Sequence, residues 1–187
     1  MPQAQPDLQT HTSTLADGRT VVTRRMHASA EDVWAVLADG WLYANWVVGA
    51  SRIRQVDPEW PDRNSRLHHS FGVWPVLVDD HTEVLAAEAG RELLLRARGW
   101  PAGAARIQIR VTGASGHESI VSMAEDAAGG PIRLIPRPAR QLLIAPRNAE
   151  ALRRLALIAE GRHRGRELLM APSTDQVDRR SAWRRSS

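Results

Sequence analysis

The stretch from residue 20 to residue 57 constrains the fold more than any other part of this chain. It opens with a β-rich run, Thr20–His27, and continues with a short predicted helix over residues 29–37 whose first turn carries two acidic side chains. An aromatic segment and a second β-rich run, Ser51–Asp57, follow. When a strand leads into a short helix and then into antiparallel strands, and one long helix closes the chain, the sheet wraps that helix like a cup. A cup of this kind encloses an apolar cavity, so the order of elements predicts a pocket for a small molecule.

Five further segments are typical of antiparallel strands. They are Arg66–Phe71, Val76–Ala87, Glu92–Gly99, Arg106–Thr112 and Glu118–Glu125. In the fourth of them, apolar residues at 107, 109 and 111 alternate with polar residues at 106, 108 and 110. This alternation predicts one buried face and one face in water. With the two runs before them, these segments predict a seven-stranded antiparallel sheet.

A long helix is predicted over residues 139–160. Its small and apolar residues recur at steps of three and four and therefore share one face. They are Leu142, Ala145, Ala149, Leu152, Ala156 and Ala159, flanked by Asn148 and Leu155. No other long apolar face could cover the open sheet, so we expect this helix to close the cavity and to end at Gly161. The chain then divides into a flexible N-terminal lead-in (1–18), one folded domain (19–162) and an arginine-rich disordered tail (163–187).

Several segments carry a resemblance to a known family. They are Val33–Asp39, Trp41–Trp46, Thr82–Leu85 with Glu88–Leu93, and Arg147–Leu155. In them the chain resembles the START-like (SRPBCC) superfamily, and within it the polyketide cyclase/dehydrase-like group, over residues 20–161. The resemblance implies the α+β helix-grip fold, an antiparallel seven-stranded sheet curved around the C-terminal helix with two short helices after the first strand. It also implies a hydrophobic ligand between sheet and helix, but no particular activity, because carriers, sensors and enzymes share this fold.

The distribution of charge argues against a nucleic-acid partner. The formal net charge is +4, and seven arginines against three acidic residues from Arg162 onward account for all of it. Nucleic-acid-binding domains carry their basic patch on the folded surface instead. No apolar run approaches the ~20 residues that span a bilayer, and the polar N-terminus lacks a signal-peptide core. We therefore expect a cytoplasmic protein without integral membrane association; a homodimer stays open.

Absent residue types and motifs restrict the chemistry further. The chain has no cysteine, which excludes disulfides and thiolate sites, and its 25 basic residues are all arginine, which excludes lysine chemistry. Motifs for phosphate loops, dinucleotides, zinc proteases and serine nucleophile elbows are missing. The run 79–81, Asp-Asp-His, follows a proline bend and is predicted to face water. Neither a metal site nor a cofactor is predicted.

His69 is the strongest candidate for a polar group inside the cup. Residues 67, 69, 71 and 73 share one face of their predicted strand, and except for His69 that face is apolar. His68 points the other way, so the two histidines cannot bind one metal together. His69 is either a hydrogen-bonded core residue or a polar anchor or acid/base group in the cavity. A hairpin centred on residues 75–76 would place Thr82 opposite His69 and Asp80 opposite Phe71.

Aromatic and amide side chains complete the predicted pocket. Trp41, Tyr43 and Trp46 lie at the expected rim, where they either pack in the core or form a gate or stacking wall. Asn148 lies beside the inward stripe of the helix, and its amide needs a backbone or ligand partner. The predicted ligand-binding set is Trp41, Tyr43, Trp46, His69, Phe71, Leu95, Ile109 and Asn148.

The function that these patterns favour is the binding or carriage of a hydrophobic small molecule, a lipid, a polyketide or an aromatic compound. An aromatic polyketide cyclase/dehydratase with His69 as its acid/base group is the first alternative, and a protein-interaction module is the second. Two or more polar groups that converge in the cavity would favour the enzyme. A large exposed apolar patch would favour the interaction module.

Overall fold

The computed structural model describes residues 10–15, 19–73, 76–99, 103–130 and 134–170. Among these residues, eight strands form one antiparallel sheet in the order β1-β2-β8-β7-β6-β5-β4-β3. The strands are β1 (Thr10–Thr14), β2 (Thr20–Met26), β3 (Ala50–Val56), β4 (Arg66–Val73), β5 (Val76–Glu88), β6 (Glu92–Gly99), β7 (Gly103–Ser115) and β8 (Glu118–Gly129). The helices are α1 (Ala30–Leu37), the 3-10 turn Gly40–Leu42, α2 (Tyr43–Trp46) and α3 (Arg137–Met170). The α+β class and the helix-grip arrangement are therefore confirmed.

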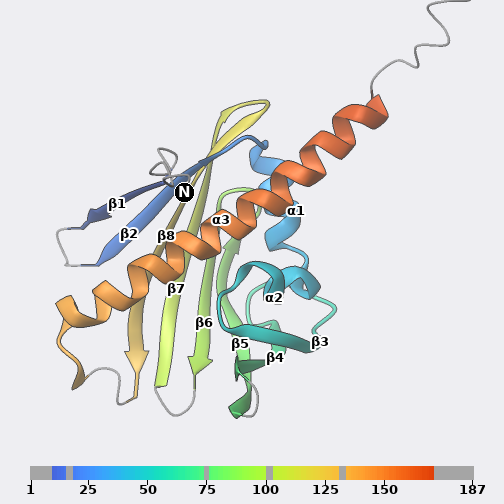
Figure 1. Cartoon of the computed structure of the whole chain (residues 1–187). Coiled ribbons are helices and arrows are strands. Elements are labelled where there is room, and N and C mark those ends of the chain that lie inside the picture. The colour runs from blue at the N-terminus through green and yellow to red at the C-terminus, as the bar shows by residue number, and fades with distance from the viewer. Residues whose placement is uncertain (1–9, 16–18, 74–75, 100–102, 131–133, 171–187) are drawn as a thin grey trace, which may run out of the picture.

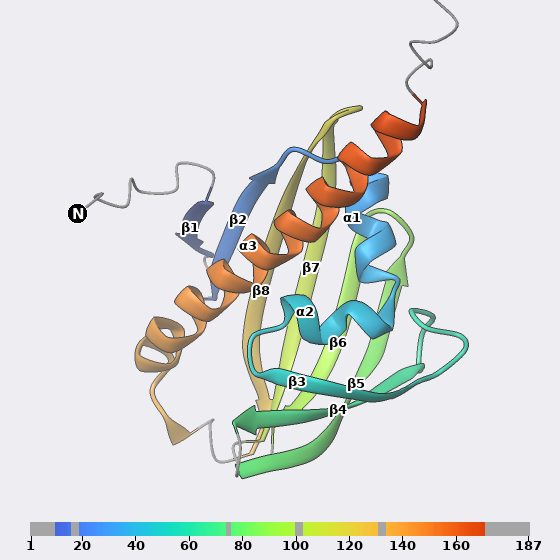
Figure 2. The ribbon, with the colours of Figure 1, turned by 45° about the vertical axis from the view of Figure 1, so that its right-hand side comes forward.

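The long helix α3 crosses one face of the curved sheet, and α1 and α2 lie beside it on the same side (Figures 1 and 2). Ser29 caps α1, because its hydroxyl accepts a hydrogen bond from the backbone N–H of Asp32 over 3.1 Å. The predicted alternation in β7 is confirmed, since Ile107, Ile109 and Val111 are buried. The core thus lies between this face of the sheet and the three helices. Within the described residues, no helix is long and apolar enough to cross a lipid bilayer.

The predicted strand count of seven is corrected by β1. This strand, Thr10–Thr14, lies within the expected flexible lead-in and pairs with β2 in the register Thr10↔Arg24 to Thr14↔Thr20. The Arg24 guanidinium donates a hydrogen bond of 2.7 Å to the Thr10 hydroxyl. An exposed edge strand made of threonine, serine and histidine has no apolar alternation, so its sequence carries no strand signal.

The predicted buried stripe of α3 is right in its centre and wrong at its beginning. Leu152 and Ala159 are fully buried, whereas Leu142 is 75% exposed. Gln141 takes the inward position instead, where its Oε1 accepts a hydrogen bond from the Thr20 N–H and its Nε2 donates one to the Glu125 carbonyl. Backbone groups of β2 and β8 need polar partners here, and an amide side chain meets that need where leucine would not.

α3 also continues beyond its predicted end at Gly161. It runs to Met170, so residues 163–170, which were expected to belong to a disordered tail, are helical. His163 and Arg166 in this extension both contact the carboxylate of Asp32 on α1. These contacts outweigh the ~1 kcal/mol that a glycine costs in a helix interior. The rest of the predicted tail, 171–187, lies outside the described residues.

The β4–β5 hairpin differs from its predicted register by two residues. His69 pairs with Asp80, and Leu67 pairs with Thr82. The predicted partners were Thr82 for His69 and Asp80 for Phe71. Because side chains alternate with a period of two, a slip of two residues leaves every residue on its predicted face. The inward direction predicted for His69 is therefore correct, and its side chain is buried, with the residue 2% exposed.

Candidate functional site

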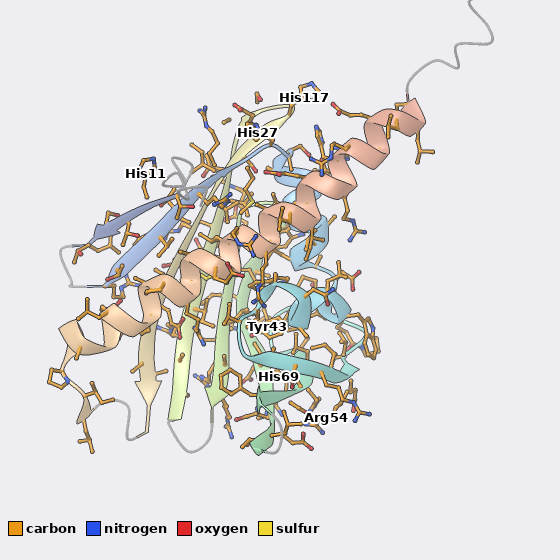
Figure 3. The ribbon with its side chains drawn as sticks, viewed as in Figure 1. His11, His27, Tyr43, Arg54, His69 and His117 are labelled. Atoms are coloured by element: carbon orange, nitrogen blue, oxygen red, sulfur yellow. The ribbon has the colours of Figure 1, made fainter. Side chains whose placement is uncertain are left out.

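A cavity of about 150 Å³ lies between the sheet, α2 and α3. Its apolar wall includes Val47, Phe71, Ala97, Ala105 and Ile107, and its polar wall includes Tyr43, His69, Glu125 and Arg147. A smaller hollow of about 10 Å³ shares part of this lining and reaches Trp46 and Asn148. Figure 3 shows Tyr43 and His69 together beneath α3. The cup therefore contains a small, mostly apolar space with several polar groups in its wall.

Phe71 reaches this wall because a glycine faces it. Gly49 has a φ of 97°, in the left-handed region that favours glycine, and an added Cβ would lie 2.3 Å from the Phe71 ring. The short segment after α2 can therefore pass close to β4.

Three buried side chains form a hydrogen-bonded chain at one side of the cavity. The Tyr43 hydroxyl lies 3.1 Å from the Thr82 hydroxyl, and the Thr82 hydroxyl lies 3.0 Å from Nε2 of His69. Thr82 is completely buried, and the other two residues are 2% exposed. The rings of Tyr43 and His69 have their centroids 5.5 Å apart. β5 thus supplies the hydroxyl that links a helix residue to a strand residue.

Counting the exchangeable protons of these three side chains shows which hydrogen bonds they can offer to a ligand. With a neutral imidazole, the three side chains hold three exchangeable protons, and the two hydrogen bonds use two of them. If Thr82 donates to Nε2 of His69, Nδ1 carries the imidazole proton and is a donor. If Nε2 donates to Thr82, Nδ1 is an acceptor. Among the described residues, Nδ1 of His69 makes no hydrogen bond of normal geometry, although a backbone group of Ser70 lies near enough to raise the pKa of the ring against the effect of burial. It can therefore bind a ligand oxygen in either arrangement, a carbonyl in the first and a hydroxyl in the second.

Burial sets the protonation states of this chain. Desolvation lowers the pKa of His69 below its ordinary value of 6.5, despite the opposing effect of the Asp80 carboxylate. Desolvation likewise raises the pKa of Tyr43 to about 12, although its hydrogen bond to Thr82 acts in the opposite direction. At neutral pH the imidazole and the phenol are both uncharged. The three hydrogen-bonded side chains can therefore donate or accept hydrogen bonds, and they bring no charge to the cavity.

An ion pair forms another part of the wall. Arg147 on α3 donates a hydrogen bond of 2.5 Å to the Glu125 carboxylate on β8. The Glu125 side chain is 6% exposed and that of Arg147 is 32% exposed. The pair joins the helix to the sheet next to the cavity, and removing either partner would leave a charge in a mostly apolar wall.

Two further polar atoms in the wall have no partner among the described residues, Nε1 of Trp46 and Nδ2 of Asn148. Both residues line the small hollow, where Trp46 is 3% and Asn148 is 1% exposed. Each atom is a hydrogen-bond donor, and buried donors are almost always paired in folded proteins. The hollow is therefore complementary to an oxygen atom that accepts hydrogen bonds.

The predicted ligand-binding residues divide into two groups. Five of them line the cavity or its hollow: Tyr43, Trp46, His69, Phe71 and Asn148. Leu95 and Ile109 are completely buried core residues outside this lining, and Trp41 is 58% exposed beside a different surface depression. Trp41 lies in a turn whose direction no periodicity reveals.

Sequence reasoning missed three residues that shape the site, Thr82, Glu125 and Arg147. An isolated threonine or glutamate in a strand gives no signal of its own. The period of two in β8 places residue 125 on the same face as residues 121 and 123, and Val121 and Met123 are buried. From this alternation in the sequence, the inward direction of Glu125 could have been predicted.

A wider depression of about 950 Å³ lies next to the cavity and shares Arg98, Gly103 and Ala104 with its lining. Charged and imidazole side chains form much of its wall, including Arg54, His68, Asp79, Asp80, His81 and Arg96. The run 79–81 thus lies on a wet surface, as predicted for Asp79, whose side chain is 64% exposed. Asp80 is an exception with a side chain only 9% exposed, because it pairs with His69 and therefore lies on the same face of the sheet as that buried residue.

Comparisons with known proteins agree with this architecture. A protein from Rhodobacter sphaeroides superposes with a TM-score of 0.62 at 19% identity, over 80% of this chain and 97% of that one. The Zhui aromatase/cyclase from Streptomyces sp. R1128 gives 0.59 at 16% identity, over 81% and 96%. A START superfamily protein from Mycobacterium smegmatis gives 0.55 at 16%, over 79% and 97%. At these identities the likeness shows the fold alone.

Among curated proteins, no sequence matches this chain significantly. The family model described as polyketide cyclase / dehydrase and lipid transport matches residues 18–160, which is most of the chain. That match includes α1, α2, the strands from β2 to β8 and the part of α3 that covers the cavity. The protein therefore belongs to the polyketide cyclase / dehydrase and lipid transport family.

Proposed function

We propose that this protein binds an apolar small molecule with one ring-sized group and an oxygen function that hydrogen-bonds to His69. The observation that carries the proposal is the position of His69 in the wall of a mostly apolar cavity, with a buried Nδ1 that makes no hydrogen bond of normal geometry among the described residues. A buried polar atom without a partner costs roughly 1–3 kcal/mol. A ligand oxygen would remove that cost, so this atom favours an oxygenated ligand over a plain hydrocarbon.

The size of the cavity limits the group that enters it. About 150 Å³ is available, and an apolar cavity of roughly that volume holds one benzene molecule. Sites for drug-sized ligands measure about 300–1,000 Å³. A fused-ring polyketide or a lipid chain would therefore extend past the cavity, and the residues that the cavity shares with the wider depression, Arg98, Gly103 and Ala104, mark where it would do so. We propose that the ring-sized group is the part of the ligand enclosed beneath α3.

The donors near α3 suggest a second oxygen on the ligand. Trp46 and Asn148 both line the small hollow, which shares part of its lining with the main cavity, and each has a buried N–H donor without a partner among the described residues. The hollow itself holds only about 10 Å³, too little for a ring, so an oxygen substituent suits it better. The proposed ligand is then a ring with oxygen atoms on two sides, one toward His69 and one toward Asn148.

Two ring-sized probes test the role of His69. Phenol and benzene have nearly the same size, and only phenol carries a hydroxyl. Calorimetric titration of the wild type should show phenol binding about 3–10-fold more tightly than benzene, the range expected for one hydrogen bond. In His69→Leu this preference should vanish while benzene still binds. In His68→Leu, which changes the neighbouring histidine on the other face, the preference should remain.

An equal preference for phenol in the wild type and in His69→Leu would refute the role of His69. If neither probe bound at millimolar concentration, the enclosed ring itself would be excluded. Native mass spectrometry of protein purified from its own host would then identify a retained ligand directly. Its mass should fit an oxygenated ring compound, with or without a tail.

A second function, acid/base catalysis in an aromatic polyketide cyclase or dehydratase, is favoured by one observation. The lowered pKa of His69 leaves a neutral imidazole next to the cavity, which can accept a proton from a substrate carbon or hydroxyl. The likeness of this protein to the Streptomyces aromatase/cyclase supports this alternative at the level of the fold. With a linear poly-β-ketone probe, His69→Leu should lower turnover by ~10²–10⁴ and preserve binding. Binding without turnover in the wild type would leave the carrier function.

The remaining sequence-based proposals are tested separately. We propose a cytoplasmic location, which cell fractionation checks. For the oligomeric state, a monomer and a homodimer are distinguished by light scattering during size-exclusion chromatography. Neither result affects the assignment of the cavity.

A further inference from the structure

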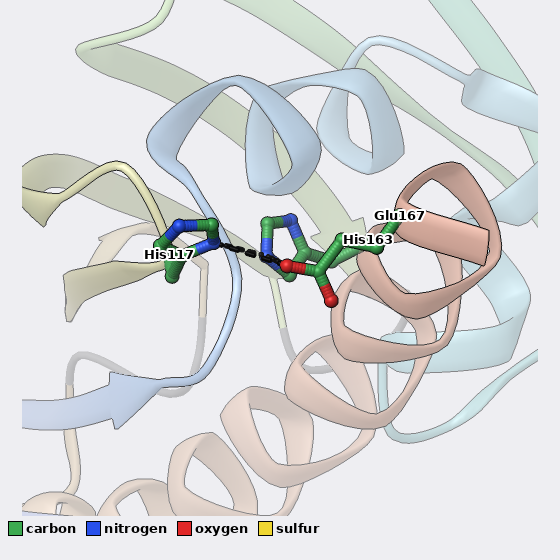
Figure 4. Close-up of side chains that lie close together, drawn as sticks. All are labelled: His117, His163 and Glu167. Carbon is green, nitrogen blue, oxygen red and sulfur yellow. Dashed lines mark hydrogen bonds and ion pairs between the residues drawn. The ribbon is translucent and has the colours of Figure 1, made fainter. Parts of the chain in front are cut away.

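A second group of titratable side chains lies at the end of the sheet away from Tyr43 and His69. The turn between β7 and β8 carries His117, and the last turns of α3 carry His163 and Glu167 (Figure 4). Figure 3 shows His117 at the far end of the β7–β8 hairpin from the cavity residues. The three residues are separate from the proposed ligand site, and nothing in the proposed function uses them.

The orientation of His163 is fixed by a buried carboxylate. Its Nδ1 lies 2.5 Å from Oδ2 of Asp32, and both side chains are 7% exposed. Oδ2 also accepts hydrogen bonds from Ser29 and Arg166, each of 2.7 Å. With Nδ1 hydrogen-bonded to this carboxylate, the other ring nitrogen, Nε2, faces His117 and Glu167.

Nε2 of His163 belongs to a nearly equilateral triangle of ligand atoms. It lies 3.2 Å from Nδ1 of His117 and 3.4 Å from Oε1 of Glu167. The third side, from Nδ1 of His117 to Oε1 of Glu167, measures 3.1 Å. In a tetrahedral zinc site with bonds of about 2.0–2.1 Å, two ligand atoms lie roughly 3.3–3.4 Å apart. The three atoms are therefore already spaced as three corners of such a tetrahedron.

We propose that His117, His163 and Glu167 bind one Zn²⁺ ion. Two imidazoles and a carboxylate suit a first-row transition metal such as zinc better than Mg²⁺ or Ca²⁺, which take mainly oxygen ligands. Asp32 acts behind His163 as an outer carboxylate that orients the ring, an arrangement common around zinc. Within the described residues, no fourth His, Cys, Asp or Glu belongs to the group. The side chains of His117 and Glu167 are 75% and 51% exposed, so water takes the fourth position.

Bound zinc would have a structural consequence in this position. It would join the tip of the β7–β8 hairpin to the part of α3 that extends beyond Gly161, while Asp32 links the same histidine to α1. Three segments far apart in sequence would then share one anchor. This site would supply a metal ligand set that the sequence analysis did not predict.

The experiment uses the full-length chain without a histidine tag, first stripped with a chelator and then titrated with Zn²⁺ against a chromophoric competitor. We expect one Zn²⁺ per chain, a rise in melting temperature with Zn²⁺ but not with Mg²⁺, and tetrahedral ligand-field bands with Co²⁺. His117→Ala should weaken Zn²⁺ binding at least tenfold and abolish the rise. His11→Ala removes another exposed histidine, on β1, and serves as the matched control with unchanged binding.

Variants at the other positions separate coordination from folding. Glu167→Gln keeps the size of an exposed side chain and should weaken Zn²⁺ binding about tenfold or more. Asp32→Asn should weaken it by about 10–100-fold, the usual effect of removing an outer-shell carboxylate, and circular dichroism checks that this variant folds. The proposal is overturned if the wild type binds no Zn²⁺ at millimolar concentration, or if His117→Ala and His11→Ala bind it equally.

Discussion

Replacing Thr82 by valine removes the hydroxyl at the centre of the Tyr43–Thr82–His69 chain while nearly keeping the shape of the side chain. Thr82 is completely buried, and its hydroxyl contacts the Tyr43 hydroxyl at 3.1 Å and Nε2 of His69 at 3.0 Å. In the variant, the Tyr43 hydroxyl and Nε2 of His69 stay buried and lose the Thr82 hydroxyl as a hydrogen-bond partner. Each such group costs roughly 1–3 kcal/mol.

The expected cost follows from these two losses and one gain. The added methyl group offsets about 0.8 kcal/mol through apolar burial. We therefore expect Thr82→Val to lower the free energy of unfolding by roughly 1–5 kcal/mol. For a chain of this length that corresponds to a fall in melting temperature of roughly 2–20 °C. Urea titration monitored by circular dichroism measures the free energy, and calorimetry measures the temperature.

A double-mutant cycle with Tyr43→Phe tests whether the two residues act together. If the two hydroxyls are hydrogen-bonded, the double variant should lose less free energy of unfolding than the two single variants added together. The reason is that the double variant leaves neither hydroxyl of the Tyr43–Thr82 bond without its partner. Thr112→Val is the control, since Thr112 lies exposed on β7 and should change stability by less than about 0.5 kcal/mol. A Thr82→Val protein as stable as the wild type would show that the hydrogen-bonded chain does not contribute to folding.

Three other perturbations test the site and the fold. Because burial lowers the pKa of His69 below 6.5, the unfolded chain gains this proton first as the pH falls, so stability should drop below about pH 6.5; urea titrations at two pH values should show a smaller drop in His69→Leu, and an identical drop would contradict the lowered pKa. Leu152→Asp should destabilise by roughly 3 kcal/mol or more, since it places an unpaired charge in the core beneath α3; an unchanged melting temperature would contradict the placement of that helix. Truncation after Met170 should leave the melting temperature nearly unchanged, whereas truncation after Gly161 removes His163 and Arg166 from the buried Asp32 and should cost roughly 3–5 kcal/mol; equal stability of the two truncated proteins would show that those contacts add nothing.

Local patterns in the sequence predicted the features that depend on local structure. The short helix that begins near Ser29 and the alternation around Ile109 are visible within a few residues, and both are confirmed. The inward direction of His69 follows from the same period of two. These signals survive an error in the predicted register, because a shift of two residues changes the partners and not the face.

Features that depend on distant partners were beyond such patterns. The extension of α3 past Gly161 is stabilised by Asp32, which lies 131 residues before His163. Gln141 faces inward because backbone groups of β2 and β8 need its amide. Hydrophobic periodicity alone predicts that the neighbouring Leu142 faces inward instead. In each case a polar contact between remote segments decides the structure, and hydrophobic periodicity does not report such contacts.

Polar contacts between remote segments also explain why two parts of α3 lie in different chemical environments. Near Asn148 the helix covers a space with mostly apolar walls, and two buried donors there, Nε1 of Trp46 and Nδ2 of Asn148, have no partner among the described residues, which suits a site for an uncharged ligand. Near His163 the helix meets α1 and the β7–β8 hairpin through charged and imidazole groups that contact one another, which suits a fixed anchor or a metal. A rigid attachment at the second end would hold the helix in place while the first end adjusts to a ligand. Zinc should therefore change the stability of the protein more than its affinity for phenol.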